Sequence, residues 1–314
     1  MAVKLGKTQG FGLPGYTWRD LFSQYFLNPH CFLSFFYLYR QMSDMNYTNK
    51  VVVITGATSG IGEACAAVFG AAGAQLVIIG RNAQKLEATA AKLQAMNLTV
   101  LPLLADAGSE ADNKRMAEEA LARFGRIDIL INNAGISMRA LFQDLDLEVF
   151  RKVMDTNFWG TVYATKFCLP AILESKGSII GISSINGYRG TPARTAYTAS
   201  KYAMNGFFES LRTEVMKKGV HVLVVAPGFT SSNIRNTALT ADGSSQGESP
   251  RDESKMMTSE EVATRILEAT TRRKRDLVLT TQGKLAVFLN KWIPGILDGI
   301  VYNQMAKEKD SPFN

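Results

Sequence analysis

Short apolar runs alternate with helical stretches through the middle of the chain, and this alternation limits the fold more than any other feature. The pattern predicts strands at residues 51–55, 75–79, 99–104, 127–131, 177–182 and 220–225, and helices at 62–72, 84–95, 110–124, 147–173 and 196–217. Strands that are apolar throughout are typical of parallel strands buried on both faces. The sequence therefore predicts an α/β fold with a single doubly wound parallel sheet. Pro170 predicts a boundary within the fourth helix, because proline has no backbone N–H.

Charged residues are distributed unevenly along the chain. Residues 51–271 hold 22 basic and 22 acidic side chains, whereas residues 1–50 carry +3 and residues 272–314 carry +4 of the net charge of +7. A nucleic-acid-binding protein would be expected to carry its basic residues through the folded body, so we expect no nucleic-acid partner. Three scattered cysteines and two histidines suit neither a disulfide framework nor a multi-histidine metal site. We therefore expect no metal and a cytoplasmic location.

The alternation also divides the chain. We expect an N-terminal extension over residues 1–46, a main domain over 47–271 and a C-terminal tail over 272–314. The extension is expected to be poorly ordered, or to be upstream sequence ahead of a natural start at Met42 or Met45; an anchor or interaction arm is the alternative. Its uninterrupted apolar run at 31–39 is far shorter than the roughly 20 residues of a membrane-spanning helix.

The C-terminal tail combines basic and apolar residues. A basic cluster at 272–275 precedes a predicted strand at 276–280, and apolar residues then recur with a helical period over 285–301, broken at 294–295. This stripe either covers the core or a subunit contact, or lies on a membrane with the basic cluster facing anionic lipid. The polar stretch at 233–258 predicts a long surface loop, either a functional lid or a disordered segment.

A glycine-rich turn follows the first predicted strand and precedes a helix. Gly56, Gly60 and Gly62 occur in the sequence TGATSGIG at 55–62. Such a turn exposes backbone N–H groups at a helix N-terminus, where a pyrophosphate binds well. The spacing differs from the G-x-G-x-x-G fingerprint, and an ordinary turn would show the same glycines. The position directly after the first strand is what favours a nucleotide site.

The end of the second strand indicates which dinucleotide would bind. A site for an unphosphorylated ribose offers Asp or Glu about 20 residues past the glycines, whereas this chain has Gly80 and Arg81 there. A guanidinium binds a 2′-phosphate, and no carboxylate is present to repel it. We therefore expect NADP(H), with NAD(H) as the weaker alternative. A solvated Arg81 with no part in binding is the simpler interpretation of the same residue.

Tyr197 and Lys201 are four residues apart in a predicted helix and therefore share one face. A free tyrosine, with a pKa near 10, is a poor acid–base catalyst at neutral pH, but a nearby ammonium favours the phenolate. Ser184 ends the preceding strand, and its hydroxyl could hold a carbonyl oxygen beside the phenol. Ser183 should point to the other face of that strand. Taken alone, such a Tyr–Lys pair is common, so its neighbours carry the interpretation.

Several motifs occur in the order and spacing of one known family. They are TGATSGIG at 55–62, LLAD ending at Asp106, NNAG at 132–135, Asn157, ISS at 182–184, YTASK at 197–201 and PG at 227–228. On these motifs the segment from Tyr47 to Thr271 resembles a short-chain dehydrogenase/reductase of the standard, non-extended type. Within that family it is similar to carbonyl reductases of the lipid and hydroxysteroid branches. The resemblance implies a Rossmann-type fold and NADP(H)-dependent interconversion of a ketone or aldehyde and an alcohol.

The resemblance also implies roles for the matching residues. Tyr197 would be the general acid or base, Lys201 would lower its pKa, Ser184 would orient the carbonyl and Asn157 would join a water-linked proton relay. The residues expected to contact the dinucleotide are Gly56, Ser59, Gly60, Ile61, Gly62, Arg81, Asp106, Asn133, Ala134, Gly135, Tyr197, Lys201, Pro227, Gly228 and Thr230, with Asn132 bracing the sheet. Ser59 and Ser232 depart from the family pattern. The first departure weakens the expectation of NADP(H), and the second keeps a hydroxyl beside the nicotinamide.

Partners and alternative functions follow from the same comparison. The resemblance implies a homodimer or homotetramer and a small-molecule carbonyl or alcohol substrate, which the loop at 229–258 does not identify. The main alternative is a non-catalytic NADP(H)-binding sensor or interaction protein on the same fold, which would be expected to lack the tyrosine, the lysine or the serine. The glycine pattern disfavours an extended-branch epimerase, and the Tyr–Lys spacing disfavours a divergent enoyl reductase.

Overall fold

Seven parallel strands form one sheet in the computed structural model, which describes residues 46–230, 234–247, 256–307, 311 and 313. The strands are β1 (Val51–Thr55), β2 (Gln75–Gly80), β3 (Val100–Leu104), β4 (Ile129–Asn132), β5 (Ser178–Ile182), β6 (His221–Ala226) and β7 (Asp276–Val278). Their order is β3-β2-β1-β4-β5-β6-β7, and every neighbouring pair is parallel. The predicted doubly wound parallel sheet is confirmed.

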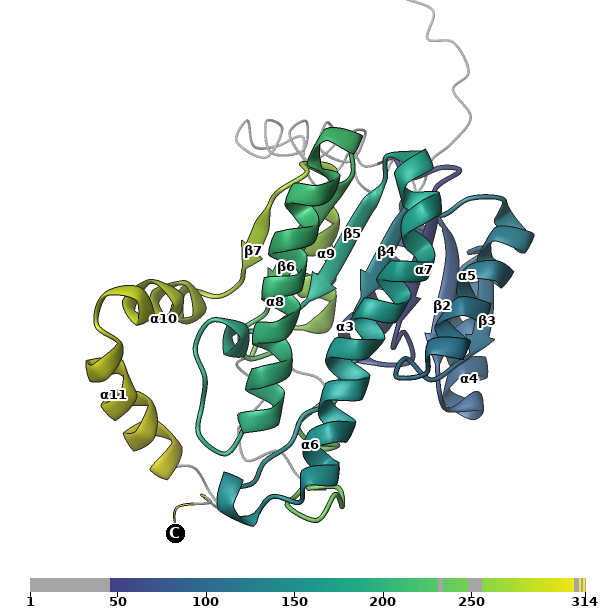
Figure 1. Ribbon diagram of the computed structural model, residues 1–314. Coiled ribbons are helices and arrows are strands. Elements are labelled where there is room, and N and C mark those ends of the chain that lie inside the picture. Colours follow the sequence, from purple (N-terminus) through teal and green to yellow (C-terminus); the bar gives the residue numbers. More distant parts are fainter. Residues whose placement is uncertain (1–45, 231–233, 248–255, 308–310, 312, 314) are drawn as a thin grey trace, which may run out of the picture. The chain divides into compact units, whose positions relative to one another are not determined.

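Helices cover both faces of this sheet (Figure 1). They are α3 (Gly60–Ala71), α4 (Ala83–Ala95), α5 (Glu110–Phe124), α6 (Leu147–Met154), α7 (Gly160–Ser175), α8 (Thr195–Val215), α9 (Ser259–Thr271), α10 (Thr281–Trp292) and α11 (Pro294–Ala306). Val53 and Val77 pack with α5, α7 and α8 in one apolar cluster. Their neighbours Ile54 and Ile78 are also fully buried and face the opposite side, where α3 packs against α9. Burial on both faces explains the uniformly apolar strands.

The order of the strands determines where a ligand can bind. Strands β2 and β3 are added on one side of β1, and β4 to β7 are added on the other side. In open α/β sheets, ligands bind beyond the carboxyl ends of the strands at the point where this direction changes. The glycine turn after β1, the NNAG motif at the end of β4 and Ser184 after β5 therefore lie at one edge of the sheet.

The long helix predicted at 147–173 is interrupted, but not at Pro170. Helix α7 continues through Pro170 to Ser175, so the boundary predicted there is wrong. Pro170 and Lys166, whose carbonyl would accept the missing N–H, are both exposed, and water can solvate that carbonyl. The interruption lies earlier, in a π-helical turn at Asp155–Trp159 between α6 and α7. Helix α9 was not predicted, although Thr258 and Glu261 form a capping box at its start.

The two ends of the chain differ in how much the structure describes. The residues from Tyr47 onward form one compact unit, while residues 1–45 of the predicted extension lie outside the described residues. In the tail, α10 and α11 are separated at Ile293, next to the predicted break at 294–295. In the described part of the chain, no helix has both the length and the apolar character needed to cross a bilayer.

Candidate active site

The glycine turn after β1 brings backbone atoms closer together than side chains would allow. Gly56 and Gly60 have φ angles of +64° and +55°, a region that favours glycine. A Cβ on Gly62 would lie 2.3 Å from the Gly56 carbonyl oxygen, and a Cβ on Gly56 would lie 2.8 Å from the Cα of Ala134. All three predicted glycines are therefore required by the shape of the turn, which ends at the N-terminus of α3.

The NNAG motif holds this turn in place. The side-chain amide of Asn133 donates to the carbonyl oxygens of Thr55 and Gly56, at 3.0 and 2.9 Å. In return, the Thr55 hydroxyl accepts from the backbone N–H groups of Asn133 and Ala134, both at 3.1 Å. Asn132 is buried and donates to the Thr165 hydroxyl of α7 at 3.1 Å. The motif thus braces two strand ends and a helix around one cleft.

Arg81 and Asp106 lie at the ends of the neighbouring strands β2 and β3. Both side chains line the same cavity as Ser59, beside the glycine turn. Asp106 accepts from the backbone N–H of Gly108 at 2.9 Å, which orients its carboxylate. With Lys85, which also lines the cavity, the cleft beside these strand ends has two basic side chains and one acidic side chain where the adenosine half of a dinucleotide was expected.

Tyr197 lies in the first turn of α8, and Lys201 follows one turn later on the same face. The Lys201 ammonium is buried, donates to the Ile182 carbonyl oxygen at 2.8 Å and lies 5.7 Å from the centre of the Tyr197 ring. Ser184 follows β5, and its hydroxyl lies near enough to the Tyr197 phenol to act on the pKa of that phenol. The Ser183 hydroxyl, by contrast, is buried and directed at the Lys201 carbonyl oxygen. The structure thus brings together Ser184, Tyr197 and Lys201.

Burial shifts the pKa values of both titratable groups in this cluster. It raises the pKa of Tyr197 above its ordinary value of 10.0, while Ser184, Arg194 and Arg235 act in the opposite direction. Lys201 is not among the groups that lower this pKa, so its predicted effect on Tyr197 stays a prediction. It lowers the pKa of Lys201 to about 8, because the ammonium has lost most of its contact with water. Both shifts favour the neutral form, and both groups lie in a cleft, which is typical of functional sites.

Asn157 occupies the π-helical turn and is completely buried. Its side-chain oxygen accepts from the Ile136 N–H at 2.8 Å, and its amide donates to the Ile136 carbonyl and the Ser200 hydroxyl, both at 2.9 Å. Ser200 in turn donates to the Tyr197 carbonyl oxygen at 2.7 Å. Asn157 therefore connects the segment after β4 to the helix that carries Tyr197. Single-turn π-helices of this kind are frequent at functional sites.

The segment after β6 forms another wall of the cleft that holds Ser184 and Tyr197. Pro227 accepts from the Ile185 N–H at 3.2 Å, and a Cβ on Gly228 would lie 2.5 Å from the Thr280 hydroxyl. Thr230 is buried, and its carbonyl oxygen accepts from Arg235 at 2.7 Å. Ser232 lies outside the described residues.

One cavity of about 700 Å³ connects these features. The predicted site residues that line it are Gly56, Ser59, Gly60, Ile61, Arg81, Asp106, Asn133, Ala134, Gly135, Ser184, Tyr197, Lys201, Pro227, Gly228 and Thr230. Gly62 and Asn157 do not line it, since the first is packed behind the turn and the second behind Ile136. These two, like the buried Asn132, therefore act from outside the cavity wall.

Sequence reasoning missed three arginines and one wall of the cavity. Arg189, Arg194 and Arg235 line it, and so do apolar residues of α10 and α11, including Leu289 and Leu297. The basic residues carry no local pattern that marks them. The apolar helical period in the tail indicated that one face of these helices is covered. It did not indicate that this face lines the cavity.

The cavity fits the expected dinucleotide. No side-chain hydrogen bond caps the N-terminus of α3, and Gly60 and Ile61 of its first turn line the cavity, an arrangement that suits a pyrophosphate. Asp106 and Arg81 lie on one side of this turn and the Ser184–Tyr197–Lys201 cluster on the other. An extended ligand with a phosphate bridge between two polar ends would match this order of groups.

Comparison with known proteins gives the family. The sequence model of the short chain dehydrogenases matches residues 50–242. The chain is 40% identical to dehydrogenase/reductase SDR family member 7B of Mus musculus, over 93% of this chain and 94% of that protein. It is 38% identical to the dehydrogenase/reductase SDR family protein 7-like of Drosophila melanogaster, over 82% and 81% of the two chains.

Solved structures with low sequence identity share the fold. A short-chain dehydrogenase/reductase from Burkholderia phymatum, solved in complex with NAD, superposes with a TM-score of 0.72 at 23% identity, covering 80% of this chain and 96% of that one. The apo form of LigD from Sphingobium superposes with a TM-score of 0.68 at 24% identity, covering 81% and 98%. Together with the family match and the relatives, this places the chain in the short-chain dehydrogenase/reductase family of oxidoreductases.

Proposed function

We propose that this protein is an NADP(H)-dependent oxidoreductase that interconverts a ketone or aldehyde and an alcohol. The observation that carries the proposal is the convergence of Ser184, Tyr197 and Lys201 in one cavity with a glycine cradle. A non-catalytic binding protein would have no need for this cluster with its buried lysine. When bound, the nicotinamide supplies or accepts the hydride.

Tyr197 is the proposed proton donor in the reducing direction. Its raised pKa keeps the phenol protonated at neutral pH, which is the state that donation requires. The Ser184 hydroxyl lies close to that phenol and holds the substrate oxygen beside it. Lys201 binds the ribose next to the phenol, and its positive charge stabilises the phenolate left after donation.

Asn157 and Ser200 position the helix that carries the acid. Asn157 bonds Ile136 on one side and Ser200 on the other, so it sets the distance between the segment after β4 and α8. The proposed proton relay runs from Lys201 toward Asn157, past Gly135. A Cβ on Gly135 would lie 3.3 Å from the Asn157 side-chain oxygen and 3.5 Å from the Lys201 ammonium nitrogen, so both groups are close to this glycine. Removing the Asn157 amide is expected to lower turnover more than cofactor affinity.

The preference for NADP(H) is assigned to Arg81. Its side chain lines the cavity at the end of β2, beside Ser59 and Lys85, and the adjacent Gly80 offers no carboxylate there. A guanidinium binds the 2′-phosphate with two parallel hydrogen bonds, whereas an unphosphorylated ribose gains nothing from it. The other proposed contacts are backbone groups of the glycine turn, Asp106 at the adenine, and Asn133 to Gly135 along the dinucleotide.

A paired cofactor and carbonyl screen tests this function. Oxidation of NADPH and of NADH is followed with aliphatic ketones and aromatic aldehydes, for the wild type, Tyr197→Phe and Arg81→Ala. We expect Tyr197→Phe to lower kcat by at least about 10²-fold with cofactor affinity retained, and Arg81→Ala to weaken NADPH about tenfold with NADH unaffected. Substantial turnover by Tyr197→Phe would overturn the assignment of the acid, and cofactor binding without any turnover in the wild type would favour the sensor alternative.

We also propose a cytoplasmic homodimer or homotetramer that contacts a membrane surface through its tail. Family resemblance supports the oligomer, which light scattering coupled to size exclusion would measure.

The membrane contact is supported by the large apolar side chains that α10 exposes, among them Phe288 and Trp292, next to Lys284 and Lys291. Helices of this composition lie in the interface of a bilayer rather than across it.

A further inference from the structure

Helices α10 and α11 form the wall of the cavity at its substrate end, but they are weakly attached to the body of the protein. Leu289, Leu297 and Val301 line the cavity from these helices. Within the two helices, which together span residues 281–306, the buried residues are Gly283, Leu297 and Met305. Elements with so few buried contacts open at a low free-energy cost. The position of this wall must therefore depend on specific polar contacts.

The first of these attachments is at Thr280, where the chain enters α10. The Thr280 hydroxyl accepts from the Gly283 N–H at 3.0 Å and caps the helix, and it also packs on Gly228 in the wall beside β6. Thr280 itself has a φ angle of +65°, which a β-branched residue rarely adopts. Backbone strain of this kind persists only where surrounding contacts maintain it. The residue thus has the features of a hinge.

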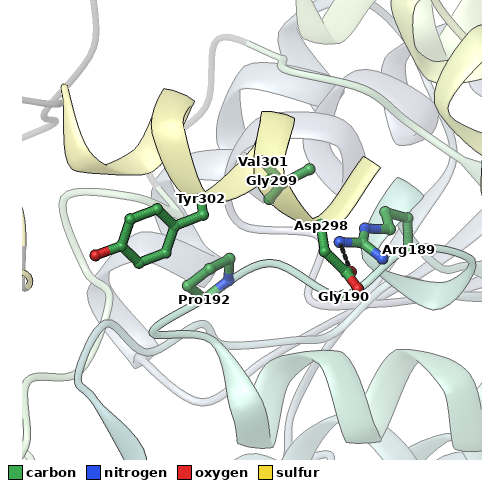
Figure 2. A pocket seen from close by; sticks show the side chains of 7 residues that line it. All are labelled: Arg189, Gly190, Pro192, Asp298, Gly299, Val301 and Tyr302. Atoms are coloured by element: carbon green, nitrogen blue, oxygen red, sulfur yellow. Dashed lines mark hydrogen bonds and ion pairs between the residues drawn. The ribbon is translucent and has the colours of Figure 1, made fainter. Parts of the chain in front are cut away.

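Arg189 makes the second attachment, and it contacts both helices at once. One guanidinium nitrogen donates to the Asp298 carboxylate of α11 at 2.5 Å, and another donates to the Asn290 side-chain oxygen of α10 at 3.1 Å. Asn290 donates back to the Tyr188 carbonyl oxygen at 2.9 Å. Figure 2 shows Arg189 and Asp298 in direct contact, with Tyr302 of α11 directed away from them. All three line a shallow surface pocket of about 540 Å³.

The location of Arg189 connects this attachment to the chemistry. Its side chain is only 15% exposed, compared with 67% for Asp298, and it lines the catalytic cavity as well as the shallow pocket outside it. It belongs to the segment between Ser184 and Tyr197, so a single side chain joins this segment to the wall formed by α10 and α11. The planar fork of arginine can bond both helices in a defined geometry, which a lysine ammonium does not reproduce.

We propose that Arg189 is a positioning residue that latches α10 and α11 over the substrate end of the cavity, and that its release opens the route for substrate and product. The proposal rests on the proposed function for its kinetic consequence, though not for its structural one. Opening moves the wall residues away from the substrate and leaves the dinucleotide end, formed by the glycine turn and Arg81, unchanged. The latch should therefore affect substrate affinity without affecting cofactor affinity.

Hydrogen exchange and kinetics on the full chain test the latch together. Arg189→Ala and Asp298→Asn should lose amide protection in 281–306 while α7 keeps it. With 2-decanone and NADPH, both variants should show KM raised about tenfold, because the closed form is less populated, with kcat within twofold. Arg189→Lys should restore little of the amide protection or of the wild-type KM. The double variant Arg189→Asp with Asp298→Arg, which exchanges the two charged side chains, should restore both.

Asp276→Asn is the matched control. It removes ion pairs with Arg275 and with Arg212, whose side chain is also 15% exposed, at a place between α8 and β7 that does not line the cavity. Unchanged protection of 281–306 in Arg189→Ala and Asp298→Asn would overturn the latch, as would a KM effect equalled by the control. Asp298 is exposed, so its variant keeps the folded state even where Arg189→Ala does not. A wild type without turnover would contradict the proposed function alone, since the exchange result is independent of it.

Discussion

Lys201 is the most deeply buried lysine of the site, and its burial has a measurable cost. The ammonium is 3% exposed and its pKa is lowered to about 8, compared with 10.5 in an unfolded chain. Between these two pH values the unfolded state binds more protons, so the free energy of unfolding rises with pH across that window. The burial penalty is fully present below pH 8 and is relieved as the pH approaches 10.5.

Urea unfolding at several pH values measures this penalty. Relative to Lys201→Met, the wild type should gain up to about 3 kcal/mol in the free energy of unfolding between roughly pH 7.5 and pH 10.5. Lys217→Met, at an exposed position in the short turn that follows α8, controls for the loss of a lysine elsewhere. A difference between wild type and Lys201→Met that stays constant over the window would show that burial does not lower the pKa of Lys201 in the folded protein.

Local spacing identified the residues whose partners are close in sequence, and it failed where partners are distant. Tyr197 and Lys201 share a helix face at four residues apart, and the structure places them together in the cavity. Arg194 was not predicted, because its guanidinium donates to the Ser137 hydroxyl, 57 residues earlier in the chain. Arg189 bonds Asp298 across 109 residues. Contacts at such separations leave no periodic pattern to read.

Among the structural elements, the glycine turn is the one whose sequence the structure explains most directly. A Cβ on Gly62 would lie 2.3 Å from the Gly56 oxygen and 2.4 Å from the Asn133 amide nitrogen. Gly62→Ala must therefore displace the turn, and we expect at least about tenfold weaker NADPH binding and roughly 1–3 kcal/mol less stability. Fluorescence titration with NADPH and urea unfolding measure the two effects.

Gly206, in the middle of α8, provides the matched control for that substitution. A Cβ there would meet nothing within 4 Å, and its φ angle is not positive. Gly206→Ala should stabilise the protein by about 0.5–1 kcal/mol through helix propensity and leave NADPH binding unchanged. If Gly62→Ala bound NADPH as tightly as Gly206→Ala does, the close approach at the turn would have no role in binding.

Asp128 ties together β1 and β4 at the end of the sheet opposite the site. Its carboxylate is buried and accepts from Arg126 at 2.6 and 2.7 Å, from the Val51 N–H at 3.0 Å and from Lys50 at 3.0 Å. Burial alone would raise its pKa, but these bonds hold the pKa of Asp128 below the ordinary 3.8. The stabilisation is therefore present above pH 3.8 and is lost as the pH falls through the folded value.

Substitution of this carboxylate should destabilise the protein without touching the active site. We expect Asp128→Asn to cost about 2 kcal/mol at pH 7, less than for a fully buried pair because Lys50 and Arg126 are half-exposed. The difference from wild type in urea unfolding should shrink at pH 3, while kcat at pH 7 stays unchanged. An equal difference at both pH values would mean that packing, rather than charge, accounts for the loss.

Helices and strands could be predicted where neighbouring residues determine them, and could not be predicted where distant contacts do. All six strands expected in the body form within two residues of their predicted ends, because their apolar runs report burial directly. The π-helical turn was not predictable, because the apolar pattern of 147–173 runs through it. It is maintained by bonds from Asn157 to Ile136 and Ser200, which exist only after the strands have assembled.

The C-terminal tail differs from the neutral body because it carries a net positive charge and exposes large apolar side chains. Its apolar stripe was expected either to cover the core or a subunit contact, or to meet a membrane. One side of the helix pair lines the cavity through Leu289 and Leu297, while Phe288 and Trp292 are 59% and 73% exposed. One pair of helices therefore offers an apolar surface to the substrate and another to the outside. This arrangement suits a protein that takes an apolar substrate from a membrane surface.

Binding to lipid vesicles tests this arrangement on the full chain. On vesicles containing anionic lipid, Phe288→Ser with Trp292→Ser should reduce the bound fraction by at least about tenfold, since two large apolar side chains no longer enter the interface. Phe142→Ser is the matched control, because Phe142 is 60% exposed outside the helix pair. Added salt should weaken wild-type binding through screening of Lys284 and Lys291. Equal losses in the double variant and the control would place the contact elsewhere, and no wild-type binding at low salt would exclude it.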